Sequence, residues 1–272
     1  MTLVSQKFVL QERRDATAIL TLNRPERHNS LIPELLSELL ESLSSIAADT
    51  SIRAVLLKAN GRSFSTGGDV QEFMRHAAPP DRLEHYARAL VGLLNETILA
   101  LMNFPAPVIA CVHGIVTGGS LGLVLASDIA LLTPEASFTP FYATVGFSPD
   151  GGWGALLPCI IGIKRTAEIL FADTTLTAMN AVALGLANRI VPREELENEA
   201  LALATTIAQN HAGSVTSAKR LLHRDIAAIA TALEDERSRF VEHILTNEAR
   251  SGMERFFAAK NKAAKNKAAK NK

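Results

Sequence analysis

Two glycine-rich segments carry the residue types in this sequence that could stabilise a negative charge. One is Phe-Ser-Thr-Gly-Gly-Asp-Val (64–70), after the apolar run 54–57, and the other is His-Gly-Ile-Val-Thr-Gly-Gly-Ser (113–120), after the apolar run 108–112. Glycine lacks a Cβ, so a ligand can approach its backbone N–H closely. An N–H at a helix start has no intrahelical acceptor and favours negative charge. Two such segments could jointly hold one oxyanion, which points to an enzyme.

The elements that must position these glycines alternate between strand and helix in the first half of the chain. Runs of β-branched and apolar residues predict strands at 17–22, 53–58, 108–112 and 128–132. Helical spacing of apolar residues predicts helices at 31–46 and 82–102. Strands that alternate with helices are typical of βαβ units, so we expect an α/β fold with a largely parallel sheet.

The second half of the sequence is almost entirely helical in pattern. Apolar spacing predicts helices at 165–172, 178–184, 194–209, 214–226 and 229–248. The last segment repeats Ala-Ala-Lys-Asn-Lys three times, from 258 to 272, and is typical of a solvated tail. We therefore expect an α/β core over 1–195, a helical C-terminal region over 196–257 and a Lys-rich tail over 258–272.

Composition fits a globular protein and argues against nucleic acid as a partner. The chain has 272 residues, of which 47% are hydrophobic and 21% charged, enough for a sizeable core. Its formal net charge is zero, but six lysines lie in the tail, which leaves 22 basic against 28 acidic side chains and a net charge of −6 for the rest. An acidic body is a poor match for a phosphate backbone.

The sequence also gives expectations about location. Its two cysteines, Cys111 and Cys159, form no metal-type cluster, and we expect buried, unpaired thiols in a reducing compartment. No basic-then-apolar leader and no stretch of about 20 apolar residues occurs, so we expect no membrane association. A cytoplasmic location is the prediction.

Several motifs in a fixed order resemble the crotonase superfamily, the enoyl-CoA hydratase/isomerase group. They are Leu-Asn-Arg-Pro (22–25), Phe-Ser-Thr-Gly-Gly-Asp (64–69), His-Gly followed by Gly-Gly (113–119), and Ser-Pro-Asp-Gly-Gly (148–152). The resemblance covers about residues 9–260. It implies a spiral of ββα units, a helical trimerisation region, a homotrimer or a dimer of trimers, and acyl-CoA thioester substrates. Fatty-acid and aromatic-acid breakdown both suit such substrates.

The resemblance also implies roles for particular residues. The oxyanion-hole N–H groups would be those of Gly68 and Gly119, holding the thioester oxygen as it becomes an enolate. Positions that meet coenzyme A, largely through backbone, fall on Arg24, Ser65, Thr66 and Val70. Phe256 and Lys260 match C-terminal positions that cover the coenzyme A of a neighbouring subunit, although Phe256 also fits simple helix packing. No metal or redox cofactor is implied, and coenzyme A enters as part of the substrate.

The sequence departs from the hydratases of this family at both catalytic glutamates. Their positions fall on Gly122 and Tyr142, neither of which is a carboxylate. The remaining candidate is Asp150, which resembles the aspartate of the family's isomerases. A single base suffices to move a proton from C2 to C4, and apolar neighbours would raise its pKa by desolvation. We therefore expect an enoyl-CoA isomerase with Asp150 as its acid/base.

Asp150 and Tyr142 have alternative interpretations. Asp150 could cap a helix beginning near Gly152, because Asp is a preferred N-cap. Tyr142 could line the acyl pocket, donate a hydrogen bond or simply pack. The family's dehalogenases place a nucleophilic aspartate at Asp150, but their partner histidine falls near Asn95. The family's thioester hydrolases have glycine at the Gly122 position, and thioester hydrolysis is the second candidate activity.

Two hypotheses lie outside this chemistry. Gly-Gly-Ser-Leu-Gly (118–122) also fits a nucleophile elbow around Ser120, but neither His211 nor His223 is well placed in a catalytic loop. A non-catalytic acyl-CoA binder is the other, since fold alone does not fix function. Asp69 is interpreted as a helix cap, and His113 as a residue that forms a hydrogen bond in a turn.

Overall fold

A mixed sheet of six strands forms the centre of the part of the chain that the computed structural model describes, residues 7–223 and 225–270, with side chains as far as residue 259. Its order is β1-β2-β3-β4-β6-β9. Within this sheet β1 and β2 pair antiparallel, and the other described neighbours pair parallel. The strands are β1 (Val9–Arg14), β2 (Thr17–Leu22), β3 (Ala54–Ala59), β4 (Val108–Val112), β6 (Ile129–Leu132) and β9 (Arg189–Ile190). The expected α/β fold with a largely parallel sheet is confirmed.

A second, smaller sheet carries one of the glycine segments. It has the order β5-β7-β8, from β5 (Ile115–Thr117), β7 (Ser137–Thr139) and β8 (Leu176–Thr177). The short helix η2 (Gly118–Ser120) follows β5 directly and leads into α4 (Leu121–Leu125). The second glycine segment therefore runs from a strand into a helix, as predicted.

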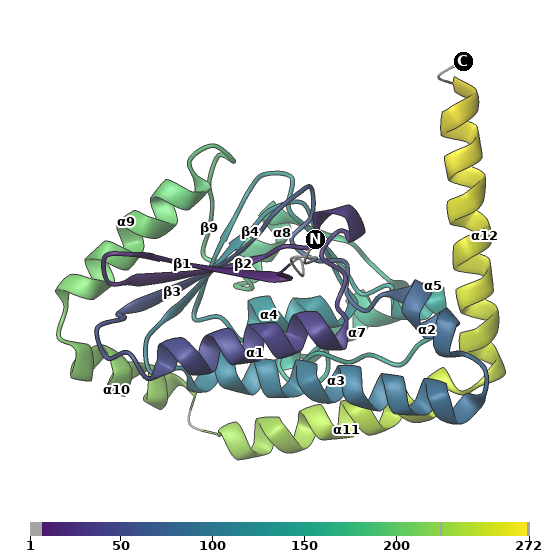
Figure 1. Cartoon of the computed structure of the whole chain (residues 1–272), viewed down its shortest axis with the longest axis horizontal. Coiled ribbons are helices and arrows are strands. Elements are labelled where there is room, and N and C mark those ends of the chain that lie inside the picture. The colour runs from purple at the N-terminus through teal and green to yellow at the C-terminus, as the bar shows by residue number, and fades with distance from the viewer. Residues whose placement is uncertain (1–6, 224, 271–272) are drawn as a thin grey trace, which may run out of the picture.

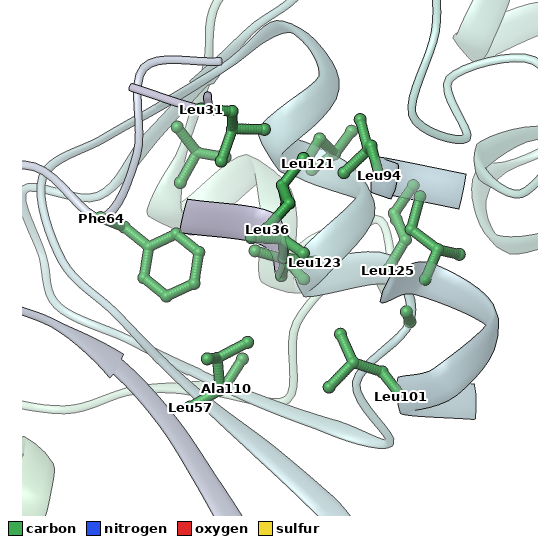
Figure 2. Close-up of a cluster of buried hydrophobic side chains, with 14 of the residues drawn as sticks. Leu31, Leu36, Leu57, Phe64, Leu94, Leu101, Ala110, Leu121, Leu123 and Leu125 are labelled. Atoms are coloured by element: carbon green, nitrogen blue, oxygen red, sulfur yellow. The ribbon is translucent and has the colours of Figure 1, made fainter. Parts of the chain in front are cut away.

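Helices cover both faces of the main sheet, because its strands are apolar on both sides. Alternate residues such as Leu20 and Leu57 belong to the large core that includes α1 (Pro33–Ala47) and α3 (Pro80–Asn103). Figure 2 shows part of this core, with leucines of α1, α3 and α4 near Phe64 and Leu57. The intervening residues, such as Ile19 and Leu56, pack against α9 (Leu196–Gln209).

The C-terminal helices lie beside α3 and then leave the body. The helix α11 (Ile226–Ile244) packs against α3. The helices that precede it in the second half of the chain, besides α9, are α5 (Tyr142–Val145), α6 (Leu157–Ile161), α7 (Ile163–Ala172), α8 (Ala178–Ala183) and α10 (Ala212–Leu222). The last helix, α12 (Asn247–Lys270), contacts α5 and α11 at its start and then projects away from the molecule (Figure 1). None of the described helices has the length and apolar character needed to cross a bilayer.

The structure corrects three expectations about local structure. The predicted helix 229–248 is two helices, because the Thr246 hydroxyl accepts the Ala249 N–H and so caps a new helix, α12. The sequence pattern predicts no strand at β1. This strand lies at the edge of the sheet with mostly exposed side chains, so it shows no alternation of apolar and polar residues. Cys111 is buried as expected, but Cys159 is exposed, so that part of the prediction is wrong.

Candidate active site

The two glycine segments lie side by side, held by backbone pairing. Ser65 and Val116 form a parallel bridge, in which the Ser65 N–H donates to Ile115 O and the Thr117 N–H donates to Ser65 O. Gly67 has a φ of +70°, and a Cβ there would lie 2.6 Å from the Thr117 carbonyl oxygen. Any larger residue at position 67 would therefore push the two segments apart.

The backbone leaves the N–H groups of Gly68 and Gly119 available to a ligand. Gly68 is bridged to Leu31 through its neighbours, because the Leu31 N–H donates to Gly67 O and the Asp69 N–H donates to Leu31 O. In a parallel bridge of this kind the N–H of the central residue points to the opposite side. Gly119 lies in the first turn of η2, where an N–H has no intrahelical acceptor.

Both glycines line a cavity of about 490 Å³. Six of the chain's 11 phenylalanines contribute to its wall, so the cavity offers an apolar site for an acyl group. These are Phe73, Phe141, Phe147, Phe240, Phe256 and Phe257. Its three carboxylates are Glu26, Asp69 and Asp150. A largely apolar cavity with a few convergent polar groups is the usual form of a substrate site.

The Asp150 carboxylate lies directly against Gly119. Its two oxygens are 3.0 and 3.1 Å from the point where a Cβ on Gly119 would sit. The Tyr142 hydroxyl lies 2.6 Å from Asp150 Oδ1 and donates to it. Burial raises the pKa of Asp150 to about 6, although the Tyr142 hydrogen bond opposes this shift. Burial, together with the Asp150 charge, also holds the pKa of Tyr142 well above its usual value.

The alternative role of Asp150 as a helix cap is wrong. No helix begins at Gly152 in the described chain, and the next one, α6, begins at Leu157. The N–H groups of Gly152, Gly154 and Ala155 instead donate to the buried carboxylate of Glu236 on α11. These three hydrogen bonds lower the pKa of Glu236, but burial outweighs them and raises it to about 7.

Sequence reasoning missed Glu236. Its signal is a carboxylate on the apolar face of α11, between Leu233 and Phe240 at helical spacing, both of which are buried. A charged side chain on such a face needs a partner inside the fold. The sequence could have flagged the position without naming that partner.

Asp69 is a structural residue beside the cavity, as predicted. Its carboxylate accepts the Gln71 N–H at the start of α2 (Val70–His76). It also pairs with Arg24 at 2.9 Å and Arg27 at 2.8 Å. These two guanidinium groups oppose the effect of burial and hold its pKa below the usual value. Asp69 is therefore a fixed anion that anchors the backbone next to Gly68.

The structure brings some of the residues expected to meet coenzyme A to the cavity and leaves others out. Thr66, Val70 and Tyr142 line it. Arg24 is buried on Asp69 and Ser30, and Ser65 is fully buried with its hydroxyl donating to Asn29 O, so neither side chain faces the cavity. The fold uses the polar side-chain groups of these two residues internally, and the contact with coenzyme A, expected largely through backbone, stays a prediction for both.

Phe256 lines the cavity of its own chain, and the expected contact with the coenzyme A of a neighbouring subunit stays a prediction. Ala249 and Met253 are buried where α12 packs on the body, which places the next turn over the cavity. Lys260 belongs to α12, but its side chain lies outside the described residues.

The nucleophile elbow is excluded by the surroundings of Ser120. Its side chain is fully buried, and its hydroxyl lies within hydrogen-bond distance of the Ser65 and Thr117 carbonyl oxygens. His223 lies on Asp128, and His113 contacts Gly61 O, as expected for a turn residue. Ser120 therefore ties the two glycine segments together.

The surroundings of Gly122 and Asn95 bear on the hydratase and dehalogenase activities known in related proteins. Gly122 has no room for a side chain, because a Cβ there would lie 2.5 Å from both Gly151 O and Ile98 Cδ1. Asn95 is buried in α3 and its amide donates to Leu233 O. Asn95 does not line the cavity, so this position cannot take the place of the partner histidine of a dehalogenase.

Comparison with known proteins places this chain in a family of acyl-CoA enzymes. Residues 12–266 match the enoyl-CoA hydratase/isomerase family. The chain therefore belongs to the enoyl-CoA hydratase/isomerase family, which acts on acyl-CoA substrates. A putative enoyl-CoA hydratase from Thermus thermophilus is 33% identical over 231 residues, 84% of this chain and 87% of that protein.

Other relatives carry different activities in their names. A trans-2-decenoyl-[acyl-carrier-protein] isomerase from Streptococcus mutans is 30% identical and covers 79% of this chain and 80% of its own. A 4-chlorobenzoyl coenzyme A dehalogenase from Arthrobacter is 30% identical over 75% of this chain and 73% of its own. The solved structure of an enoyl-CoA hydratase from Bacillus halodurans superimposes with a TM-score of 0.85 at 27% identity, covering 91% and 99% of the two chains. The crotonase fold is thus confirmed.

Proposed function

We propose that this protein is an enoyl-CoA isomerase, which shifts a double bond of an acyl-CoA thioester with Asp150 as its single acid/base. The observation that carries the proposal is the position of the Asp150 carboxylate against Gly119, inside an apolar cavity. Of the three cavity carboxylates, Glu26 is exposed and Asp69 is bound by two arginines. Only Asp150 combines burial with a raised pKa, as a base working near neutral pH requires.

The proposed reaction needs one proton-transfer group and one oxyanion site. Asp150 removes a proton from C2 of a 3-enoyl thioester, and the electrons move to the thioester oxygen to form a dienolate. The N–H groups of Gly68 and Gly119 stabilise that oxygen, because fixed donors need no reorganisation during the reaction. Asp150 then delivers the proton to C4 as the double bond settles between C2 and C3. The reaction needs no cofactor beyond the coenzyme A of the substrate.

The two positions of the hydratase glutamates support an isomerase over a hydratase. Gly122 is packed against Gly151 and Ile98. Tyr142 uses its hydroxyl on Asp150. Activation of water for addition to the double bond would need a second carboxylate near the first, and neither position supplies one. The name of the Streptococcus mutans relative is in line with this assignment.

The test follows 3-enoyl-CoA conversion by the wild type, Asp150→Asn and a control, Glu234→Gln, whose side chain lies on α11 and pairs with Arg237. The absorbance of the 2-enoyl thioester and the release of free thiol are recorded together. We expect an absorbance gain without thiol release, lost in Asp150→Asn and retained in the control. Thiol release would instead assign a thioester hydrolase, and tight binding of acyl-CoA without either signal would assign a binder.

We also infer that the chain acts as a homotrimer or a dimer of trimers. Support comes from large apolar side chains that α7, α8 and α10 leave largely exposed: Ile163, Phe171, Met179, Leu221 and Leu222. Exposed apolar surface of this kind commonly marks an interface. Light scattering coupled to gel filtration should give a mass of three or six chains, and a mass of one chain would contradict the assembly.

A further inference from the structure

The buried carboxylate of Glu236 holds a single loop through three hydrogen bonds. Its Oε2 accepts the Gly152 N–H at 2.8 Å, and its Oε1 accepts the N–H groups of Gly154 at 2.5 Å and Ala155 at 2.9 Å. The residue is only 8% exposed. A buried anion that receives three donors from one turn fixes that turn, because each N–H left without an acceptor would be costly.

The loop held by Glu236 begins with Asp150 and touches the oxyanion segment at two further points. Gly151, with a φ of +64°, packs so closely that a Cβ there would lie 2.4 Å from Gly119 O. The Trp153 indole Nε1 donates to Gly118 O at 2.8 Å. The placement of Asp150 against Gly119 therefore depends on how this whole loop is seated.

Glu236 reaches the loop from a different part of the chain. It lies on α11, which packs along α3, and Phe240 one turn later on α11 lines the cavity. Glu236 itself does not line the cavity. Its carboxylate therefore makes no contact with the cavity, and its hydrogen bonds act on the site through the loop, although its charge also interacts with that of Asp150.

We propose that Glu236 is a positioning residue for Asp150, fixing the turn from Gly152 to Ala155 and thereby the distance between the Asp150 carboxylate and Gly119. This role rests on the proposed function of Asp150 as the base. It needs a carboxylate at position 236, because both oxygens accept. A glutamine with its oxygen at the Oε1 position would keep the Gly154 and Ala155 bonds but turn its NH₂ group toward the Gly152 N–H.

The first test uses Trp153, the only tryptophan of the chain, which is fully buried within this loop. Its fluorescence reports the seating of the loop without any substrate. We expect Glu236→Gln to shift the emission to longer wavelength and to increase quenching by acrylamide. The matched control, Glu234→Gln, removes a half-exposed carboxylate two residues away on the same helix and should leave both signals unchanged.

The second test separates kcat from KM for the turnover that the wild type shows. Misplacing a reacting group by about 1 Å can cost about 10²-fold in rate, so we expect a fall of this order in kcat for Glu236→Gln. KM should change little, because Glu236 does not line the cavity. A folded Glu236→Gln with wild-type fluorescence and kcat would overturn the proposal, as would equal effects in the control.

A second variant, Glu236→Asp, keeps the proposal testable if Glu236→Gln does not fold. Glu236→Asp keeps the charge but withdraws the carboxylate by one methylene, so it should give a smaller fluorescence shift and a partial loss of kcat. Wild-type behaviour of Glu236→Asp in both readouts would count against the proposal. If the wild type shows no isomerase activity, the proposed reaction fails, while Trp153 fluorescence still decides whether Glu236 seats the loop.

Discussion

The Tyr142 hydroxyl donates a 2.6 Å hydrogen bond to Oδ1 of Asp150, and both side chains are buried. No other described residue donates a hydrogen bond to Oδ2 of Asp150. One carboxylate oxygen is therefore fixed by Tyr142 while the other, close to Gly119, remains available for a substrate proton. The tyrosine at the position of a hydratase glutamate thus forms a hydrogen bond with the proposed base itself.

The pH dependence of kcat/KM should report the ionisation of Asp150. Its pKa is raised to about 6 by burial, and only the ionised carboxylate can accept the C2 proton. We expect kcat/KM for 3-enoyl-CoA isomerisation to rise with pH through a midpoint near 6 and then level off. Initial rates measured between about pH 5 and pH 8 would give this midpoint, because the range extends about one to two pH units on either side of it. A flat profile over this range would contradict a base with this pKa.

Tyr142→Phe should move that midpoint to higher pH. The phenol hydrogen bond favours the ionised form of Asp150, so its loss raises the pKa of the carboxyl further. A hydrogen bond to a charged group contributes about 1.5–3 kcal/mol, or about one to two pKa units, so kcat/KM at pH 7 should fall by about two- to fifteenfold. The loss should be partly recovered at higher pH, whereas a loss independent of pH would indicate that Tyr142 acts only through packing.

Asp150→Asn should abolish the proposed activity and yet stabilise the protein above pH 6. The pKa of Asp150 rises from 3.8 to about 6 on folding, so its favourable contribution is present below pH 3.8 and is lost as pH rises through 6. At about 1.36 kcal/mol per pKa unit, the ionised carboxylate costs on the order of 2–3 kcal/mol of unfolding free energy.

Urea unfolding of both proteins at several pH values would measure this difference. We expect Asp150→Asn to be the more stable at pH values well above 6, with the gap closing as the pH approaches the unfolded-state value of 3.8. Glu236 also has a raised pKa, near 7, but it is present in both proteins and largely cancels in the comparison. An equal stability difference at every pH would contradict burial of the Asp150 charge.

Gly119→Ala should remove most of the activity. The new Cβ would lie 2.7 Å from Leu94 Cδ2 and 3.0 Å from Asp150 Oδ1, between the proposed oxyanion donor and the proposed base. Alanine keeps the backbone N–H, but the Cβ would displace it from a substrate oxygen, and loss of one oxyanion donor typically costs about 10²–10³-fold in kcat. The control is Gly213→Ala in α10, where a Cβ meets nothing within 4 Å and alanine favours the helix. Comparable losses in both variants would show a general effect on folding.

Ser120→Ala should retain activity, in contrast to the replacement of a catalytic serine. The hydroxyl lies between the Ser65 and Thr117 carbonyl oxygens, and its loss should lower stability by about 1 kcal/mol. Isomerisation rates and thermal unfolding would measure the two effects. Labelling of the wild type at Ser120 by a serine-reactive phosphonate would contradict this structural role.

Much of the fold could be predicted from sequence because the spacing of apolar residues marks strands and helices locally. The buried runs that became β2, β3 and β4, and the apolar spacing of α1 and α3, were all visible in the chain. The edge strand β1 was not, because most of its side chains are exposed and show no apolar alternation. The break between α11 and α12 was also hidden, since it depends on a single capping threonine.

The sequence by itself determined the glycine segments, the absence of both hydratase glutamates and the presence of one candidate base, because these are matters of residue type and spacing. Only the tertiary structure decided which polar groups meet. In the folded chain Arg24 pairs with Asp69, the Ser65 hydroxyl donates to Asn29 O, and Phe256 lines the cavity of its own chain. The tertiary structure also joined Tyr142 to Asp150, and Glu236 to a loop more than 80 residues earlier, because burial forces each polar group to find a partner that chain order does not indicate.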